Sequence, residues 1–235
     1  KMATPINAVI SGTGMSVPEK VLTNAELEKL VDTSDEWITT RTGIRERRIA
    51  APGEPLSLYA VEASRRALDA SGLEPGDIDL IILATVTPDM PIPATACKIQ
   101  HRLGCHRAPA FDMAAGCSGF LYAQSVAKQY LINGRLHHVL VIGAELLSKY
   151  VDWKDRSTCV IFADGAGAVC IAAEETDQAV GEPDGFAVGD DEGSDVPFVH
   201  KLHRFKNGAF FCNGSHEGFL FQDRFDCLHD SYPCR

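Results

Sequence analysis

Residues 110–132 read AFDMAAGCSGFLYAQSVAKQYLI and combine the signals of a strand, a turn and a helix. Its first four residues, Ala110–Met113, have the pattern of a short strand, and the small residues that follow favour a tight turn. Gly119–Ile132 predicts a helix, because apolar side chains recur on one face. These side chains are Phe120, Ala123, Ala127, Tyr130 and Leu131. A strand that turns directly into a helix is typical of α/β folds.

Further strands are expected on both sides of this unit. Asp79–Val86 and Val139–Ala144 are continuous apolar runs, a pattern that indicates strands buried on both faces of a parallel sheet. Ala8–Gly14 predicts a strand that ends in a Gly-Thr-Gly turn. Cys159–Ala173 predicts two strands joined at Asp164-Gly165. The strands alternate with helices, so we predict a layered α/β fold.

Helix signals fill the intervals between the strands. Thr23–Val31 and Ser34–Arg41 each begin with a capping hydroxyl, which can accept a hydrogen bond from the first helical turn. Leu56–Ala70 has a helical apolar period, and Gly72 is expected to end that helix. Pro93–Leu103 predicts a helix with proline in its first position.

Composition excludes several classes of protein. The chain has 235 residues, of which 45% are hydrophobic, and it carries a net charge of −10. This acidity argues against non-specific nucleic-acid binding. The apolar runs are too short to cross a bilayer and no secretory signal is visible, so we expect no membrane association and a cytoplasmic location. The basic residues gather locally, where they form either a site for an acidic partner or a solvated loop. They are Arg41, Arg45, Arg47 and Arg48.

Residues 181–235 differ from the rest of the chain. They are rich in phenylalanine, glycine and aspartate but have no sustained helical or strand period. We therefore predict a folded α/β domain over residues 1–180 and an irregular tail of uncertain origin over residues 181–235. The tail also holds a set of possible metal ligands whose spacing matches no common metal site, so no metal is expected. They are Cys212, His216, Cys227, His229 and Cys234.

Cys117 lies in the turn between the expected strand and helix. Unpaired N–H groups at a helix start favour negative charge, and hence the thiolate form of the sulfur. Donors in the same turn could stabilise an oxyanion when the thiolate attacks a thioester. A buried core thiol that happens to begin a helix fits the local pattern equally well. Cys159 and Cys170 lie within apolar runs and are expected to be such core thiols.

Several longer motifs, in collinear order, resemble those of the β-ketoacyl-acyl-carrier-protein synthase III family of the thiolase-like superfamily. The resemblance runs from about Pro5 to about Ala173. It implies a layered αβαβα architecture of which mainly the N-terminal half is present. The motifs are TSDEWITTRTGIRERR from Thr33, ILATVTPDM from Ile82, PATAC from Pro93, DMAAGCSGF from Asp112 and DWKDRSTCVIFADGAGA from Asp152.

The resemblance assigns roles to individual residues. It implies that Cys117 is the nucleophile that accepts an acyl group from acyl-coenzyme A. Trp37 and Arg156 match positions that hold the adenine end of coenzyme A, while Arg41 and Thr33 match further coenzyme A contacts. A core role for the tryptophan and surface ion pairs for the arginines are the structural alternatives.

The resemblance also implies a homodimer, in which Ile92 shapes the acyl pocket across the interface. The family's histidine, in a Pro-His-Gln-Ala-Asn type motif, and its asparagine, in a Gly-Asn-Thr-Ser type motif, have no counterpart in the sequence. His200 follows Val-Pro-Phe-Val, but the next residues do not continue the histidine motif. Asn207 and Asn213 precede glycines and are interpreted as turns.

The implied function is that of an acyltransferase of the synthase III type. Cys117 would take an acyl group from acyl-coenzyme A and pass it to malonyl-acyl-carrier protein, a condensation that initiates fatty acid biosynthesis. Coenzyme A thioester is the substrate, and no cofactor is expected. Two alternatives remain: a truncated, non-catalytic fragment of such an enzyme, or another thiolase-like enzyme, such as one that makes alkylquinolones, polyketide starters or 3-hydroxy-3-methylglutaryl-coenzyme A.

Overall fold

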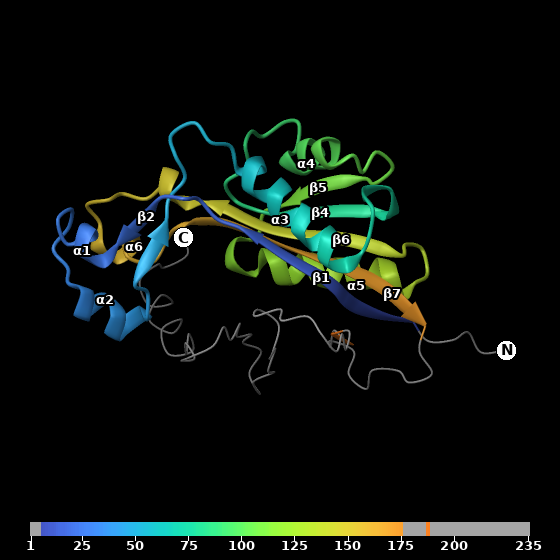
Figure 1. Cartoon of the computed structure of the whole chain (residues 1–235), viewed down its shortest axis with the longest axis horizontal. Helices are drawn as coiled ribbons and strands as arrows, with labels where there is room; N and C mark the ends of the chain where they lie inside the picture. Colours follow the sequence, from blue (N-terminus) through green and yellow to red (C-terminus); the bar gives the residue numbers. More distant parts are fainter. Residues whose placement is uncertain (1–5, 176–186, 189–235) are drawn as a thin grey trace, which may run out of the picture.

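The computed structural model describes residues 6–175 and 187–188, which form a mixed sheet with helices on both faces (Figure 1). The sheet has six strands in the order β5-β4-β6-β7-β1-β8. Strand β4 runs parallel to β5 and β6, whereas β7 is antiparallel to both β6 and β1. The strands are β1 (Ile6–Ser16), β4 (Leu80–Ala84), β5 (Ala110–Met113), β6 (His138–Leu146), β7 (Asp164–Glu175) and β8 (Ala187–Val188).

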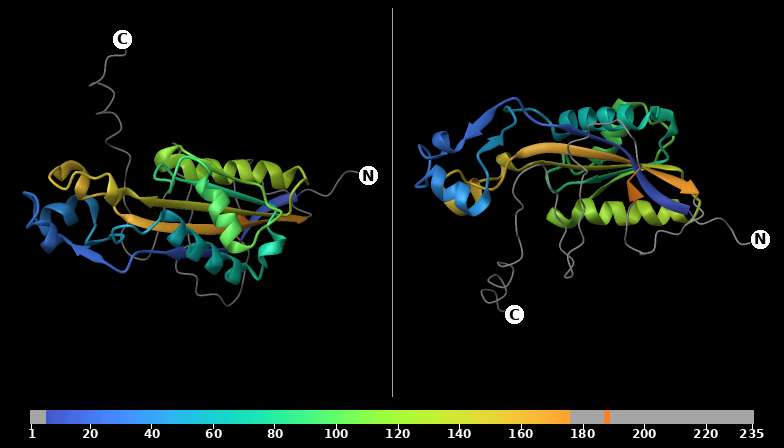
Figure 2. Two further views of the ribbon diagram at one scale, coloured as in Figure 1. Left: turned by 90° about the horizontal axis from the view of Figure 1, so that it is seen from above. Right: turned by 60° about the horizontal axis from the view of Figure 1, so that its bottom comes forward.

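Helices α3 (Leu56–Ser71) and α4 (Thr95–Leu103) cover one face of the sheet, and α5 (Gly119–Ile132) covers the other (Figure 2). The position of β4 in the sheet explains why its sequence is apolar without interruption. Ile81 and Leu83 pack into the cluster under α3, while the alternating residues of the strand pack into the cluster under α5. Both faces are buried, as the continuous apolar run predicts.

A small lobe extends from one end of the sheet, at the left of Figure 1. It has its own apolar core, formed by Leu27, Ile38, Cys159 and Val160. The Thr23 and Ser34 side chains cap α1 and α2, as predicted. The lobe consists of β2 (Val21–Thr23), β3 (Glu46–Arg48), α1 (Asn24–Leu27), α2 (Asp35–Thr42) and α6 (Arg156–Cys159).

The turn predicted at Gly12-Thr-Gly14 is wrong, because these residues lie inside β1. The glycines serve helix packing instead of chain reversal. A Cβ atom on Gly14 would lie 2.2 Å from the carbonyl oxygen of Ala63, and one on Gly12 would lie 2.4 Å from that of Ala67. Helix α3 therefore packs directly on the backbone of β1 at these two positions.

Three other details differ from the sequence prediction. Cys159–Ala173 is not a pair of strands: α6, capped by the Asp155 side chain, ends at Cys159, and a single strand begins at Asp164. Tyr130 is 43% exposed and does not join the buried face of α5. Helix α4 begins at Thr95, after a cis Ile92–Pro93 bond. Asp112 on β5 fixes that start, because its carboxylate accepts the N–H groups of Thr95 and Ala96.

Most of the tail predicted over residues 181–235 lies outside the described residues, as do His200, Asn207, Asn213 and the five possible metal ligands. Ala187–Val188 is described and pairs in parallel with Val9–Ile10 of β1. Within the described residues, no helix is long and apolar enough to cross a membrane.

Candidate active site

Cys117 lies in the short 3-10 turn η2 (Gly116–Ser118), which joins β5 to α5. Gly116 has a φ of 52°, a left-handed conformation that glycine adopts without steric cost. The Ser118 hydroxyl closes the turn by donating to the carbonyl of Ala115 at 3.2 Å. The Cys117 side chain is exposed, so it is not the core thiol that the local pattern also allowed.

A pocket of about 320 Å³ opens beside Cys117. Its walls are mostly backbone and small side chains, so an acyl carbonyl could approach the sulfur closely. Phe120 rests on β6 where Gly143 leaves room, since a Cβ on Gly143 would lie 3.0 Å from the phenyl ring. The lining residues are Ala84, Gly116, Cys117, Phe120, Gly143, Ala144, Glu145, Gly165, Ala166 and Gly167.

Glu145 is the one charged residue in that lining, and no sequence motif singles it out. Its carboxylate accepts the backbone N–H of Val86 at 2.8 Å and the hydroxyls of Thr85 and Thr87. The Thr87 hydroxyl in turn accepts the N–H of Leu146 at 2.9 Å. Glu145 thus ties the turn after β4 to the end of β6, which fixes one wall of the pocket.

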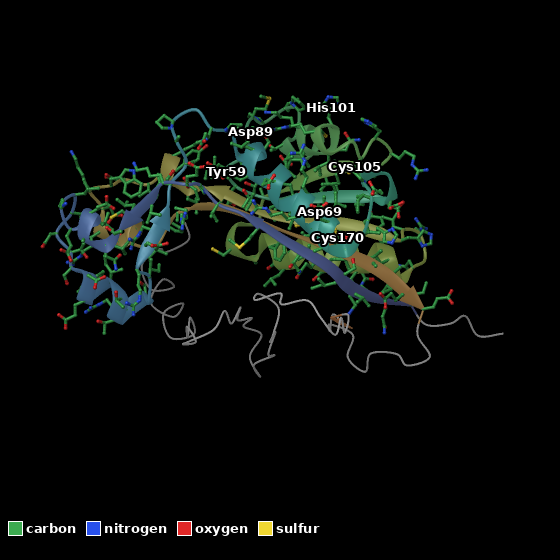
Figure 3. All side chains as sticks on the ribbon, viewed as in Figure 1. Tyr59, Asp69, Asp89, His101, Cys105 and Cys170 are labelled. Carbon is green, nitrogen blue, oxygen red and sulfur yellow. The ribbon has the colours of Figure 1, made fainter. Side chains whose placement is uncertain are left out.

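The cysteines of the described residues fall into two groups. Cys97 and Cys117 are exposed, whereas Cys105, Cys159 and Cys170 are buried (Figure 3 labels Cys105 and Cys170). Burial raises the pKa of Cys105 and of Cys170 to about 11, and it also raises the pKa of Cys159. The expectation that Cys159 and Cys170 are core thiols is confirmed.

Limited alkylation with iodoacetamide at pH 8 is therefore expected to label Cys117 and Cys97 and to spare the three buried thiols. At this pH only about one in a thousand thiols with a pKa near 11 is ionised, and burial also blocks the reagent. Peptide mapping of the labelled chain measures the pattern, and the same treatment in guanidinium should label all five of these described cysteines. Labelling of Cys170 as fast as Cys117 in the folded chain would contradict this arrangement.

The structure brings Trp37, Arg41 and Arg156 together in the small lobe. The Arg41 guanidinium lies 4.5 Å from the centroid of the Trp37 ring, and that of Arg156 lies 4.7 Å from it. Arg156 also donates to the carbonyl of Asp32 at 3.1 Å. The buried Thr33 hydroxyl has no hydrogen-bond partner within the described part of the chain. None of these residues lines the Cys117 pocket.

Two further predicted residues lie apart from this group. Ile92 is 86% exposed, on the loop between β4 and α4, and it does not line the pocket. The basic cluster of the sequence is not one surface patch. Arg41 and Arg45 are exposed and Arg48 is half-buried, but Arg47 is turned into the lobe and is buried.

Curated proteins resemble this chain over about three quarters of its length. The family model for 3-oxoacyl-[acyl-carrier-protein] synthase III matches residues 111–184. The β-ketoacyl-[acyl-carrier-protein] synthase III of Caldanaerobacter subterraneus is 58% identical over 175 residues, which are 74% of this chain and 53% of that protein. The Natranaerobius thermophilus synthase III is 51% identical over 189 residues, which are 80% and 56% of the two chains. The chain spans about half the length of these curated relatives.

Solved structures agree with this relationship. The 3-oxoacyl-[acyl-carrier-protein] synthase III of Aquifex aeolicus superimposes with a TM-score of 0.70 at 54% identity, over 72% of this chain and 55% of that one. The priming β-ketosynthase of the R1128 polyketide pathway has a TM-score of 0.71 at 38% identity, over 75% and 53%. The α/β fold with a central sheet matches these structures. Through residues 6–175, the chain belongs to the 3-oxoacyl-[acyl-carrier-protein] synthase III family of the thiolase-like superfamily.

Proposed function

We propose that this chain supplies the acyl-accepting part of a 3-oxoacyl-[acyl-carrier-protein] synthase III. The observation that carries the proposal is the exposed Cys117 at the start of α5, in a pocket walled by small residues. The Cys117 thiolate attacks the carbonyl carbon of an acyl-coenzyme A and forms a tetrahedral oxyanion. The carbon–sulfur bond to coenzyme A then breaks, coenzyme A leaves as a thiolate, and the acyl group remains as a thioester on Cys117.

In the complete reaction, malonyl-acyl-carrier protein would lose carbon dioxide and its enolate would attack the acyl-Cys117 thioester. That step forms a carbon–carbon bond and releases the cysteine, so the product is a 3-oxoacyl thioester. It needs no metal or redox cofactor. We propose coenzyme A thioesters and an acyl carrier protein as partners, and the cytoplasm as the compartment. Ile92 is exposed, and among the described strands β5 pairs only with β4, so its outer edge is open; both features favour a homodimer with this end of the sheet at its interface.

We further propose that Trp37, Arg41, Arg156 and Thr33 bind coenzyme A. The indole offers a stacking surface for adenine, and the guanidinium groups offer positive charge for phosphates. In the structure the Arg156 guanidinium is already within contact distance of the ring, so a base can enter between the two only when that side chain moves aside. The unpartnered Thr33 hydroxyl supports a polar contact nearby.

Trp37→Ala is expected to weaken coenzyme A binding by about 5- to 150-fold, because one aromatic stack with a base contributes about 1–3 kcal/mol. Isothermal titration calorimetry with coenzyme A measures the change. Trp153→Phe is the matched control, because Trp153 packs on the same lobe's apolar core and has no assigned contact with the ligand. Equal affinity of Trp37→Ala and the control would remove the tryptophan from the site.

The second candidate is another thiolase-like condensing enzyme, which the likeness to the R1128 priming ketosynthase favours. Incubation of the chain with acyl donors of several lengths, and with malonyl-acyl-carrier protein or malonyl-coenzyme A as acceptor, separates the candidates. A 3-oxoacyl-carrier-protein product supports the synthase III proposal. A product formed only on another acceptor supports the second candidate, and acylation without any condensation supports a chain that performs the first half-reaction alone.

A further inference from the structure

Arg47 is the largest fully buried side chain of the described residues, with 1% of its surface exposed. Its Nε and Nη2 donate to the carbonyl oxygen of Val160 at 3.1 and 2.7 Å, and its Nη1 donates to Oδ1 of Asn24 at 2.8 Å. No described carboxylate forms an ion pair with it. Burying a cation costs free energy, which here is offset only by hydrogen bonds to neutral groups.

These contacts join the two segments that carry the proposed coenzyme A residues. Val160 is the residue that follows α6, and α6 begins with Arg156. On the other side, the Asn24 amide donates to Oδ1 of Asp35 at 2.7 Å and to the carbonyl of Ile44 at 2.8 Å. Asp35 is the first residue of α2, two positions before Trp37.

The connection matters because Arg47 and Val160 are 113 positions apart in the chain. Apart from Arg47, the two segments are held together by the small apolar core of the lobe, in which Ile38 from α2 packs with Cys159 and Val160, and by Arg156 itself, which contacts Trp37 and the carbonyl of Asp32. The Arg156 contacts belong to the side chain that must move when a base enters, so they cannot set the spacing of the bound state. Apolar contacts are not directional, whereas three charge-assisted hydrogen bonds from one planar group fix both distance and orientation.

We propose that Arg47 is a positioning residue for coenzyme A binding. It sets the spacing between α2 and α6, and this spacing fixes the relative position of Trp37 and Arg156 that coenzyme A binding requires. The inference rests on the proposed function, since it deepens the role of the same binding site. Arg47 does not touch the ligand itself, because it is buried beneath the site. Lysine cannot replace it, since an ammonium on a flexible stem lacks the planar fork that bonds Val160 and Asn24 together.

The test compares Arg47→Lys with Arg48→Lys in the full chain. Arg48 is the next residue of β3 and forms an exposed ion pair with Glu46, so the control makes the same chemical change outside the lobe's interior. Coenzyme A affinity is measured by calorimetry. The rate of Cys117 acetylation is measured at varied concentrations of acetyl-coenzyme A and of acetyl-pantetheine, a donor that lacks the adenine nucleotide.

Arg47→Lys is expected to weaken coenzyme A binding and to raise the half-saturating acetyl-coenzyme A concentration by about tenfold, because Trp37 and Arg156 must then be ordered by the ligand. The maximal acetylation rate and the kinetics with acetyl-pantetheine should stay as in the control, a split that general unfolding of the chain would not produce. Equal coenzyme A affinity of Arg47→Lys and Arg48→Lys overturns the inference and leaves the proposed function intact. A wild-type chain that is acetylated but binds no coenzyme A nucleotide overturns both the binding site and the inference.

A second pair of variants keeps the inference falsifiable if Arg47→Lys does not fold. Asp35→Ala removes the shorter hydrogen bond from Asn24 to α2, at 2.7 Å, and leaves the longer one to the Thr39 hydroxyl at 3.4 Å. Glu36→Ala removes the neighbouring acidic residue of the same helical turn and keeps both bonds. Asp35→Ala is expected to weaken coenzyme A binding about threefold relative to Glu36→Ala, a smaller effect because only one hydrogen bond of the connection is lost. No difference between the two variants would overturn the connection through Asn24.

Discussion

Cys117→Ala is expected to lower the rate of coenzyme A release from acetyl-coenzyme A by at least about 10³-fold, because removal of a covalent nucleophile leaves no group to accept the acyl chain. No other described cysteine can take its place: three are buried and protonated at neutral pH, and Cys97 does not line the pocket. Colorimetric detection of the released thiol, followed as a single turnover, measures the effect.

Cys97→Ala is the control for this experiment, because it removes the other exposed thiol of the described residues and leaves the pocket unchanged. It is expected to retain the wild-type rate within about twofold, as surface substitutions usually do. If Cys117→Ala released coenzyme A as fast as Cys97→Ala, Cys117 would not be the group that accepts the acyl chain.

Gly14→Ala is expected to lower the free energy of unfolding by about 3 kcal/mol, at the upper end of the usual cost of overpacking. The added methyl group would lie 2.2 Å from the carbonyl oxygen of Ala63 and 2.5 Å from the backbone nitrogen of Ala67. Both atoms belong to the backbone of α3, which cannot move aside as a flexible side chain can. The whole helix must shift away from β1, with a fall in Tm of roughly 10 °C.

Gly167→Ala is the matched control, because Gly167 lies on the neighbouring strand β7, opposite Met15 of β1. A Cβ on Gly167 would meet no described atom within 4 Å, and its φ is not left-handed. Its Tm should stay close to that of the wild type in the same thermal denaturation experiment. Equal Tm values for the two variants would show that α3 does not rest on the backbone of β1 at Gly14.

The sequence predicted those parts of the fold whose signal is local. The apolar runs of β4 and β6, the Ser34 cap and the stop at Gly72 each depend on a few neighbouring residues, and the structure has them as expected. The turn prediction at Gly12 and Gly14 is wrong for a physical reason. A glycine needed for a close approach of two elements looks, in sequence, the same as one needed for a left-handed φ, and only the position of α3 distinguishes them.

Less of the candidate site than of the fold can be predicted from the sequence, because several of its residues act through distant partners. The turn around Cys117 is a local feature and is predictable, but the local pattern fits a core thiol equally well, and only the family resemblance points to Cys117, Trp37 and Arg156 as site residues. Glu145 and Arg47 carried no such signal. Glu145 acts through Thr85 and Thr87, which lie about sixty positions away, and Arg47 acts through Val160, which is more distant still. In sequence, Arg47 reads as one member of an exposed basic run, and only the tertiary structure shows that it is turned inward.

The most direct test of the central claim, that Cys117 is the acyl acceptor, is peptide mapping by mass spectrometry after the wild-type chain has been incubated with acetyl-coenzyme A. We expect a single acetyl group, bound as a thioester on the peptide that contains Cys117 and released by hydroxylamine. An acetyl group on Cys97 instead, or a folded chain that remains unmodified while it binds coenzyme A, would contradict it.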